Sequence, residues 1–165
     1  QRQMCIRDRK KIANGILLSL GSAPQYVKYF VVRNLKIGAE KAGRNIDEID
    51  IATYILCSVS KDKNEEHKAA KGFITYALAY TPKEILNVCG YDEEEIKPVR
   101  ETLKTEGLKE AMKHVTDDMF KTFAAIGTPE ECKDKIEEFV EKGTKHPIIL
   151  PVGNIKLAIE TVTSK

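Results

Sequence analysis

The segment Ile49-Asp50-Ile51-Ala52-Thr53-Tyr54-Ile55-Leu56-Cys57-Ser58-Val59 (49–59) decides the fold of this chain. It is rich in β-branched residues and mostly apolar on both of its alternating faces. That pattern is typical of a central strand in a parallel sheet that helices cover. The sequence around this segment therefore has to supply neighbouring strands and crossover helices.

A strand and a helix are predicted immediately upstream. The apolar run 16–20 ends at Gly21 and is expected to form a buried strand. Ser22, followed three residues later by Gln25, is expected to cap the next helix. That helix has an apolar stripe at helical spacing and should end near Gly43, because glycine is the usual residue after a helix C-terminus.

A further unit occupies the C-terminal third of the chain. Gly127-Thr128-Pro129-Glu130-Glu131 (127–131) combines an N-cap threonine, a first-turn proline and a glutamate three residues after the cap, so a helix should begin there and end at Gly143. A strand over 147–153 and a last helix follow. Three successive strand-then-helix units imply an α/β fold with a parallel sheet and helical crossovers.

The segment between the second and third units, up to Gly127, is predicted to form a run of short helices. Thr81 with Glu84 is expected to cap one of them. The stretch 92–106 is strongly charged with a thin apolar stripe, which favours a surface insertion. Thr116 should open a helix whose Met119, Phe120 and Phe123 face the core.

The first nine residues, Gln1 to Arg9, are expected to be foreign to the protein. They show no apolar period, no cap and no signal-peptide pattern. Met4-Cys5-Ile6-Arg7-Asp8 (4–8) matches one reading frame of the transposon mosaic end used in sequencing adaptors. We therefore expect residues 1–9 to be an adaptor-derived peptide and the native sequence to occupy residues 10–165.

Charge and cysteine content narrow the class of function. The chain has 27 Lys and Arg against 25 Asp and Glu, and setting the peptide 1–9 aside leaves 24 of each sign, well interspersed. Because of this charge pattern, neither a nucleic-acid partner nor a membrane partner is expected. The protein is expected to be cytoplasmic. Cys57, Cys89 and Cys132 are far apart with no histidine at metal-ligand spacing, so no disulfide framework and no metal site is expected.

The three histidines are scattered along the chain. His67 and His114 lie among charged residues in helical patterns, and His146 comes just before a strand. For each of them a surface or structural role is favoured over a catalytic one.

Four stretches, taken in order, resemble the luciferase-like oxidoreductases. They resemble the sixth strand of that family, the link into its seventh strand and two later segments: 12–18 (IANGILL), 39–51 (AEKAGRNIDEIDI), 115–119 (VTDDM) and 127–132 (GTPEEC). The segment 115–119 and the helical stretch before it are similar to one branch of the family, the archaeal methylenetetrahydromethanopterin reductases. Asn14 stands where the family usually has Asp, and 146–153 (HPIILPVG) departs from its usual ending.

The resemblance implies the C-terminal part of a (β/α)₈ barrel, its last three strand-helix units with a helical insertion. A complete barrel runs to about 250 residues. It further implies an oxidoreductase that transfers a hydride between the deazaflavin coenzyme F420 and a pterin-type substrate such as methylenetetrahydromethanopterin. An FMN-dependent monooxygenase of the same family is the alternative. With the first five strands outside residues 10–165, this chain alone is expected to be inactive and to hold no catalytic residue.

The same resemblance predicts where this chain contacts the coenzyme. Barrel enzymes bind ligands at the carboxyl ends of the strands and in the loops that follow. The free backbone N–H groups after Gly21 could also receive a coenzyme phosphate. The predicted coenzyme-binding residues are Ser19, Gly21, Ser22, Ala23, Cys57, Ser58, Pro151, Val152 and Gly153.

Two expectations concern partners. The full-length protein is expected to act on a small molecule and to form a homo-oligomer. A hypothesis of another class is a non-enzymatic helical interaction domain that uses the charged helices between Asn64 and Met119. That hypothesis predicts that the three sheet segments are buried within a self-contained sheet, whereas the barrel hypothesis predicts open strand edges and a missing flank, which expose apolar surface and unpaired backbone.

Overall fold

The computed structural model describes residues 13–19, 21–62 and 67–164. The predicted foreign peptide 1–9 lies outside the described residues. The strands are β1 (Gly15–Leu18), β2 (Asp50–Val59), β3 (Ala124–Gly127) and β4 (His146–Pro151). The helices are α2 (Pro24–Tyr26), η1 (Val27–Val32), α3 (Arg33–Lys41), η2 (Ile46–Glu48), α4 (Lys68–Tyr80), α5 (Lys83–Val88), α6 (Glu93–Thr105), α7 (Leu108–Ala111), η3 (Met112–His114), α8 (Asp117–Phe123), α9 (Pro129–Glu141) and α10 (Ile155–Thr163).

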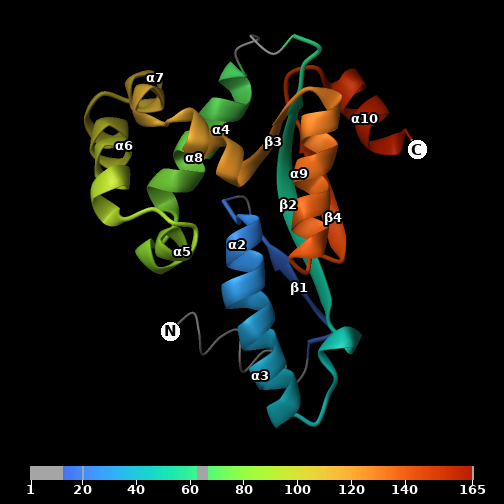
Figure 1. The fold of residues 1–165 in the computed structure, drawn as a ribbon. Coiled ribbons are helices and arrows are strands. Elements are labelled where there is room, and N and C mark those ends of the chain that lie inside the picture. Colours follow the sequence, from blue (N-terminus) through green and yellow to red (C-terminus); the bar gives the residue numbers. More distant parts are fainter. Residues whose placement is uncertain (1–12, 20, 63–66, 165) are drawn as a thin grey trace.

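The long strand β2 is the centre of a parallel sheet, as its sequence predicts (Figure 1). Along one edge, the first four residues of β2 pair with β1, with Ile51 opposite Ile16, and its last four residues pair with β3. Along its other edge β4 pairs with it from Ala52 to Cys57. The three predicted strands are therefore adjacent and parallel, in the order β1, β2, β4.

Strand β3 was not predicted from the sequence. Ala124-Ala125-Ile126-Gly127 has one β-branched residue and follows a helical aromatic pattern, so local propensity gives no strand signal. It forms because the last four residues of β2 extend beyond β1 and offer free backbone groups for pairing.

One face of β2 packs against helices. Ile51, Ile55 and Cys57 point to this face and are at most 2% exposed. They lie in one apolar cluster with Val31 of η1 and Leu35 of α3, and with side chains of α9 and α10. Burying an aliphatic side chain of this size contributes roughly 1.5–3 kcal/mol relative to leaving it exposed. The helix-facing side of the sheet is thus a closed core.

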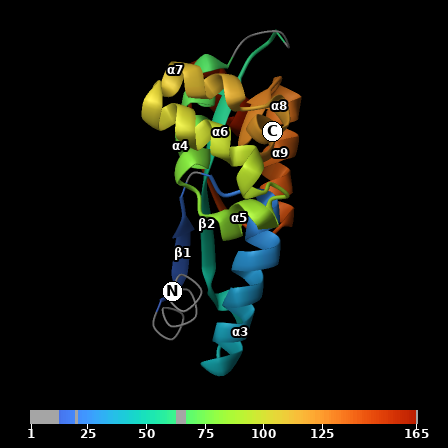
Figure 2. The same cartoon turned by 90° about the vertical axis from the view of Figure 1, so that its left-hand side faces the viewer.

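The helices α4 to α8 form a second layer to one side of the sheet (Figures 1 and 2). Their apolar cluster includes Ile74 of α4, Phe120 of α8 and Leu56 from the opposite face of β2. The charged stretch 92–106 forms α6, most of whose side chains are exposed or half-buried, and its thin apolar stripe, Ile96 and Val99, is fully buried in that cluster. Met119, Phe120 and Phe123 face the core as predicted.

Helix caps agree with the sequence in part. Thr128 begins α9 with the predicted capping box, and Thr116 begins α8. Ser22 and Thr81 do not cap as predicted: the N-caps are Ala23 and Pro82. The two hydroxyls donate instead to backbone carbonyls of the preceding segment, Ser22 to Ser19 and Thr81 to Ala77, so they close turns rather than open helices.

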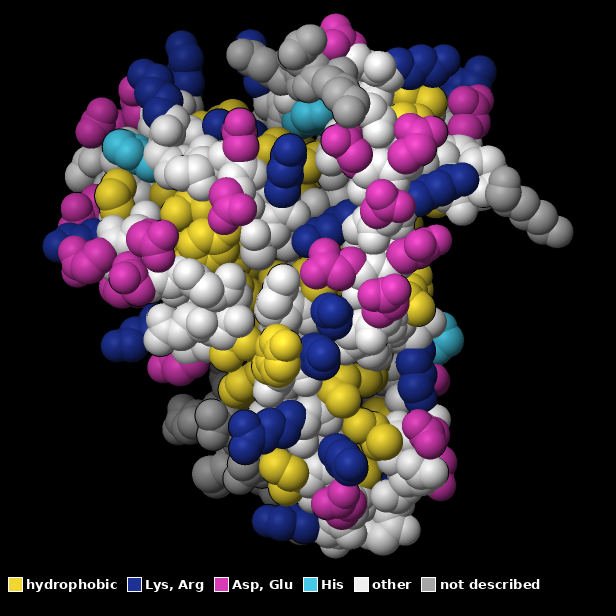
Figure 3. Space-filling view, in the orientation of Figure 1, with side chains coloured by type: hydrophobic (Ala, Val, Ile, Leu, Met, Phe, Trp, Pro, Cys, Tyr) yellow, Lys and Arg dark blue, Asp and Glu magenta, His cyan; other side chains and the backbone are white. Residues whose placement is uncertain are grey.

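The other face of the sheet is partly open. Leu17 is 57% exposed and Tyr54 is 37% exposed, although both lie on strands. The last helix, α10, likewise exposes an apolar stripe made of Ile155, Ile159 and Val162. On the face drawn in Figure 3, Lys and Arg side chains alternate with Asp and Glu. Within the described ranges, no helix has the length and apolar character needed to cross a bilayer.

Candidate functional site

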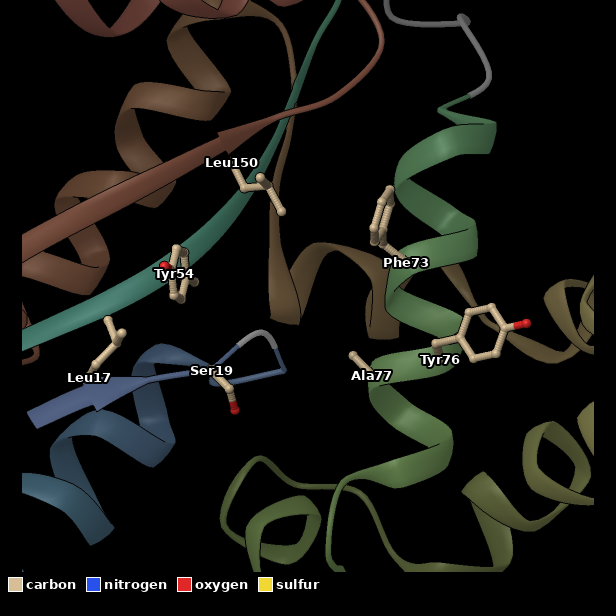
Figure 4. A pocket seen from close by; sticks show the side chains of 7 residues that line it. All are labelled: Leu17, Ser19, Tyr54, Phe73, Tyr76, Ala77 and Leu150. Atoms are coloured by element: carbon tan, nitrogen blue, oxygen red, sulfur yellow. The ribbon is translucent and has the colours of Figure 1, made fainter.

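An apolar pocket lies between the open face of the sheet and helix α4 (Figure 4). Its volume is about 610 Å³, within the roughly 300–1,000 Å³ range typical of small-molecule sites. The residues that line it are Leu17, Ser19, Tyr54, Phe73, Tyr76, Ala77 and Leu150. The pocket thus joins all three predicted strands to a helix of the second layer.

Strand alternation places the sheet residues of the pocket. Side chains two apart on a strand share a face, so Tyr54 and Leu56 point to the same side of β2. Register brings Leu17 of β1 and Leu150 of β4 to that side, because Leu18 pairs with Thr53 and Leu150 with Leu56. These contributors are far apart in sequence, which is why no local motif revealed the pocket.

Helix α4 supplies the opposite wall. Phe73, Tyr76 and Ala77 lie within about one turn of each other and line the pocket. The other side of the helix packs Ala70, Ile74 and Leu78 into the second apolar cluster, each at most 1% exposed. That packing fixes the position of the aromatic wall relative to the strands.

The chemistry of this lining favours an apolar planar ligand. None of the seven lining residues carries a carboxylate, an amine, a guanidinium or an imidazole. The rings of Tyr54 and Phe73 and the side chains of Leu17 and Leu150 provide stacking and dispersion contacts, whereas the ring of Tyr76 points away from the strands (Figure 4). The lining can orient a ring and exclude water. A flavin-like or deazaflavin-like ring fits a wall of this kind.

The predicted coenzyme-binding residues after β1 lie in different environments. Ser19 is exposed and lines the pocket. Gly21, Ser22 and Ala23 are buried close to the end of α4. A side chain at Gly21, whose φ is +86°, would lie 3.0 Å from Thr81 Oγ1, so the turn and α4 are in close contact.

Cys57, another predicted coenzyme ligand, lies on the helix-facing side of β2. It is fully buried with Cys132 of α9 in the closed core. A hydrogen bond with Cys57, together with burial, raises the pKa of the Cys132 thiol. Strand alternation therefore separates Cys57 from the pocket face, while its neighbour Ser58 points to that face.

The segment after β4 continues along β2. The Val152 N–H, one residue past the end of β4, donates to the Cys57 carbonyl at 2.9 Å. Pro151 and Val152 are half-buried, and Gly153 is exposed with φ +74°. A side chain at Gly153 would lie 3.5 Å from Ser58 Oγ, so this turn lies beside Ser58.

Ser58 makes a contact that sequence reasoning missed. Its Oγ lies 2.8 Å from Nδ1 of His67, the residue that precedes α4, although the sequence favours a free surface histidine there. The His67 ring also lies 6.4 Å from the Phe120 ring, centroid to centroid. The placement of His67 among charged residues gave no sign of this partner nine positions upstream.

His146 lies at the other end of the sheet. Its Nε2 is 3.1 Å from Asp50 Oδ1, where β4 and β2 begin, and both side chains are exposed. This pair joins the amino ends of two strands. A structural role for His146, as favoured by the sequence, matches that position.

Two curated proteins with similar sequences are archaeal reductases. The chain is 29% identical to 5,10-methylenetetrahydromethanopterin reductase from Methanopyrus kandleri over 98% of this chain and 46% of that protein. The same enzyme from Archaeoglobus fulgidus is 29% identical over 87% of this chain and 44% of its own length. The chain thus spans less than half the length of these curated relatives.

A solved structure agrees with this relationship. The coenzyme F420 dependent tetrahydromethanopterin reductase from Methanopyrus kandleri superposes on 97% of this chain with a TM-score of 0.83, and the match covers 46% of that chain. The α/β fold with a parallel sheet is therefore confirmed, and the coverage is consistent with part of a larger barrel.

The family assignment follows from the sequence model. The model described as luciferase-like monooxygenase matches residues 7–146, well over half of the chain. The motifs at 12–18, 39–51, 115–119 and 127–132 lie inside that match. This chain belongs to the bacterial luciferase-like family.

Proposed function

We propose that the full-length protein containing this chain, called the parent protein below, is a coenzyme F420-dependent oxidoreductase that acts on methylenetetrahydromethanopterin. The observation that carries this proposal is the match to the reductase fold over nearly the whole chain, at 29% identity. The aromatic pocket on the open face of the strands supports it, because a ring-shaped coenzyme needs such a wall. Barrel enzymes bind their ligands at the carboxyl ends of the strands.

The residues of this chain act by holding and shielding the reactants. A bound deazaflavin supplies the hydride chemistry, and the protein supplies orientation and a dry environment. Phe73 and Tyr54 form opposite walls that set the plane of a bound ring. Leu17 and Leu150 exclude water beside it, which keeps the reacting atoms at a fixed separation. No acid or base is assigned to this chain.

The open surfaces support a larger barrel. In the parent protein, five upstream strand-helix units would close the barrel around the open face of the sheet and leave the pocket at its mouth, and the first of those helices would cover the stripe Ile155, Ile159 and Val162 on α10. Exposed apolar area of this kind is rare on a complete soluble domain unless it is an interface. The parent protein then has the eight strands of a (β/α)₈ barrel.

The remaining expectations belong to the parent protein as well. A small-molecule substrate follows from the proposed activity. Homo-oligomer formation and a cytoplasmic location stay predictions. So does the assignment of Gly21 and Ser22 as a phosphate-binding turn, which in this structure is buried beside the end of α4.

An FMN-dependent monooxygenase is the alternative that the family description favours. The two functions are separated by titrating the purified parent protein with coenzyme F420 and with FMN, following ligand fluorescence. The proposal predicts saturable binding of F420 and F420-dependent turnover of methylenetetrahydromethanopterin. Tight retention of FMN with no F420 binding would exclude it.

A further inference from the structure

The contact between Ser58 and His67 is a polar pair at the end of an apolar wall. Ser58 is 4% exposed and lies on the face of β2 that carries Tyr54 and Leu56. Its side-chain partner is His67 Nδ1, at 2.8 Å. A buried hydroxyl group normally donates its hydrogen to an acceptor. The contact with Ser58 therefore constrains the orientation of the His67 imidazole ring.

The direction of this hydrogen bond follows from the available acceptors. Among the described residues, His67 Nδ1 is the acceptor within reach of the Ser58 hydroxyl. If Ser58 donates to Nδ1, the ring hydrogen is on Nε2. Within that same part of the chain, Nε2 has no hydrogen-bond partner. The pair therefore presents an oriented N–H donor that none of the described residues receives.

The surroundings leave this donor accessible. Gly153, in the turn after β4, has no side chain to fill the space 3.5 Å from Ser58 Oγ. His67 itself is only partly buried. Phe120 lies on one side of the imidazole and fixes the ring further. The niche is at the carboxyl ends of β2 and β4, the edge of a parallel sheet where ligands bind.

We propose that His67, oriented by Ser58, is a specificity-determining residue that donates a hydrogen bond from Nε2 to an acceptor oxygen of a ligand that extends from the pocket to the carboxyl ends of β2 and β4. Neither residue lines the pocket itself, but Ser58 lies two positions beyond Leu56, whose pairing partner Leu150 does line it. This inference rests on the proposed function. The acceptor is a carbonyl, phosphate or carboxylate oxygen, and it belongs either to the deazaflavin coenzyme or to the pterin substrate. The apolar pocket holds the ring, and the pair fixes its position along the wall.

A helix-capping role for the His67 side chain does not account for the geometry. His67 is the N-cap residue of α4, but its side chain makes no capping hydrogen bond. Its ring nitrogen contacts a strand residue instead. Loss of the imidazole therefore removes no helix cap.

The test uses the parent protein and two separate readouts. The dissociation constant for coenzyme F420 is measured by fluorescence titration, and the KM for methylenetetrahydromethanopterin is measured under saturating F420. In the variant His67→Ala, we expect one of these two values to rise about three- to tenfold, as for a lost hydrogen bond. The value that rises identifies which ligand supplies the oxygen.

Matched variants separate binding from folding. His67→Gln keeps an N–H donor and should recover much of the lost affinity. Ser58→Ala should show a smaller loss of the same value, because the imidazole is present but no longer oriented. His114→Ala, at an exposed histidine of η3, should leave both values unchanged. Melting temperatures are recorded for all four variants.

The outcomes are distinct from those that test the activity itself. If the wild-type parent protein binds no F420, the proposed function fails. If the wild type binds F420 and His67→Ala changes neither value, the role of His67 is overturned while the function stands. Equal loss of both affinities together with a lower melting temperature would also overturn it, because that pattern indicates a structural role.

Discussion

Thr53 Oγ1 and Thr144 Oγ1 lie 3.0 Å apart in the protein interior, 91 residues apart in sequence. Thr53 belongs to β2, and Thr144 lies in the turn that leads from α9 into β4. Both residues are at most 1% exposed. Their hydrogen bond joins the central strand to the entry of its neighbour, so it helps to define the register of the sheet.

The first prediction concerns this pair. In the parent protein, Thr53→Val should lower the free energy of unfolding by about 1–3 kcal/mol, because Thr144 is left buried without its partner. The double variant with Thr144→Val should be closer to the wild type than the sum of the single effects. Urea unfolding of all four proteins measures this coupling. Strictly additive losses would show that the two hydroxyls do not interact.

The second prediction concerns the pocket wall. Replacing Phe73 by alanine should weaken coenzyme F420 binding about three- to tenfold, since aromatic contacts contribute roughly 0.5–1.5 kcal/mol beyond burial. Tyr80→Ala is the matched control, because Tyr80 is on the same helix, is 75% exposed and does not line the pocket. Fluorescence titration compares the two variants. Equal effects of both would contradict the assignment of the pocket.

The third prediction is a pH dependence. Burial, with a further contribution from the hydrogen bond to Asp118, raises the pKa of Tyr91 from 10.0 to about 12. The Tyr91 hydroxyl is 2.6 Å from Asp118 Oδ2 and 2.9 Å from Thr122 Oγ1, which ties the start of α6 to α8. The folded state therefore holds the phenolic proton more tightly than the unfolded state.

The sign of the effect follows from this difference. The contribution of Tyr91 to stability is fully present below pH 10 and is lost as pH rises toward 12. The difference in unfolding free energy between wild type and Tyr91→Phe should shrink over that interval, as measured by urea unfolding at several pH values. A difference that stays constant from pH 9 to 12 would refute the shift.

Much of the fold could be predicted because its signals are local. The apolar run 49–59 and the capping chemistry of Thr128 each specify an element from a few adjacent residues. The predicted strand over 16–20 is observed as Gly15–Leu18, and that over 147–153 as His146–Pro151. Strand β3 could not be predicted, because it depends on free edge groups of β2 rather than on its own residues.

The site was harder to predict for a physical reason. Its walls combine Leu17, Tyr54 and Leu150 from three strands with aromatic residues of α4, and only the sheet register brings them together. Of the predicted residues at strand ends, Ser19 lines the pocket. Strand ends were a poor guide to side-chain direction, since Cys57 faces the closed core while the next residue faces the pocket side. Because side chains alternate between the two faces of a strand, counting residues from Tyr54 would have placed Cys57 and Ser58 on opposite faces.

The central claim is that this sheet needs further strands to close a barrel around its open face. Sedimentation velocity of the 165-residue chain alone, at micromolar concentration, tests that claim most directly. Exposed Leu17 and Tyr54 and the apolar stripe of α10 should make the chain associate or aggregate. A single monomeric species that unfolds cooperatively in urea would contradict the claim.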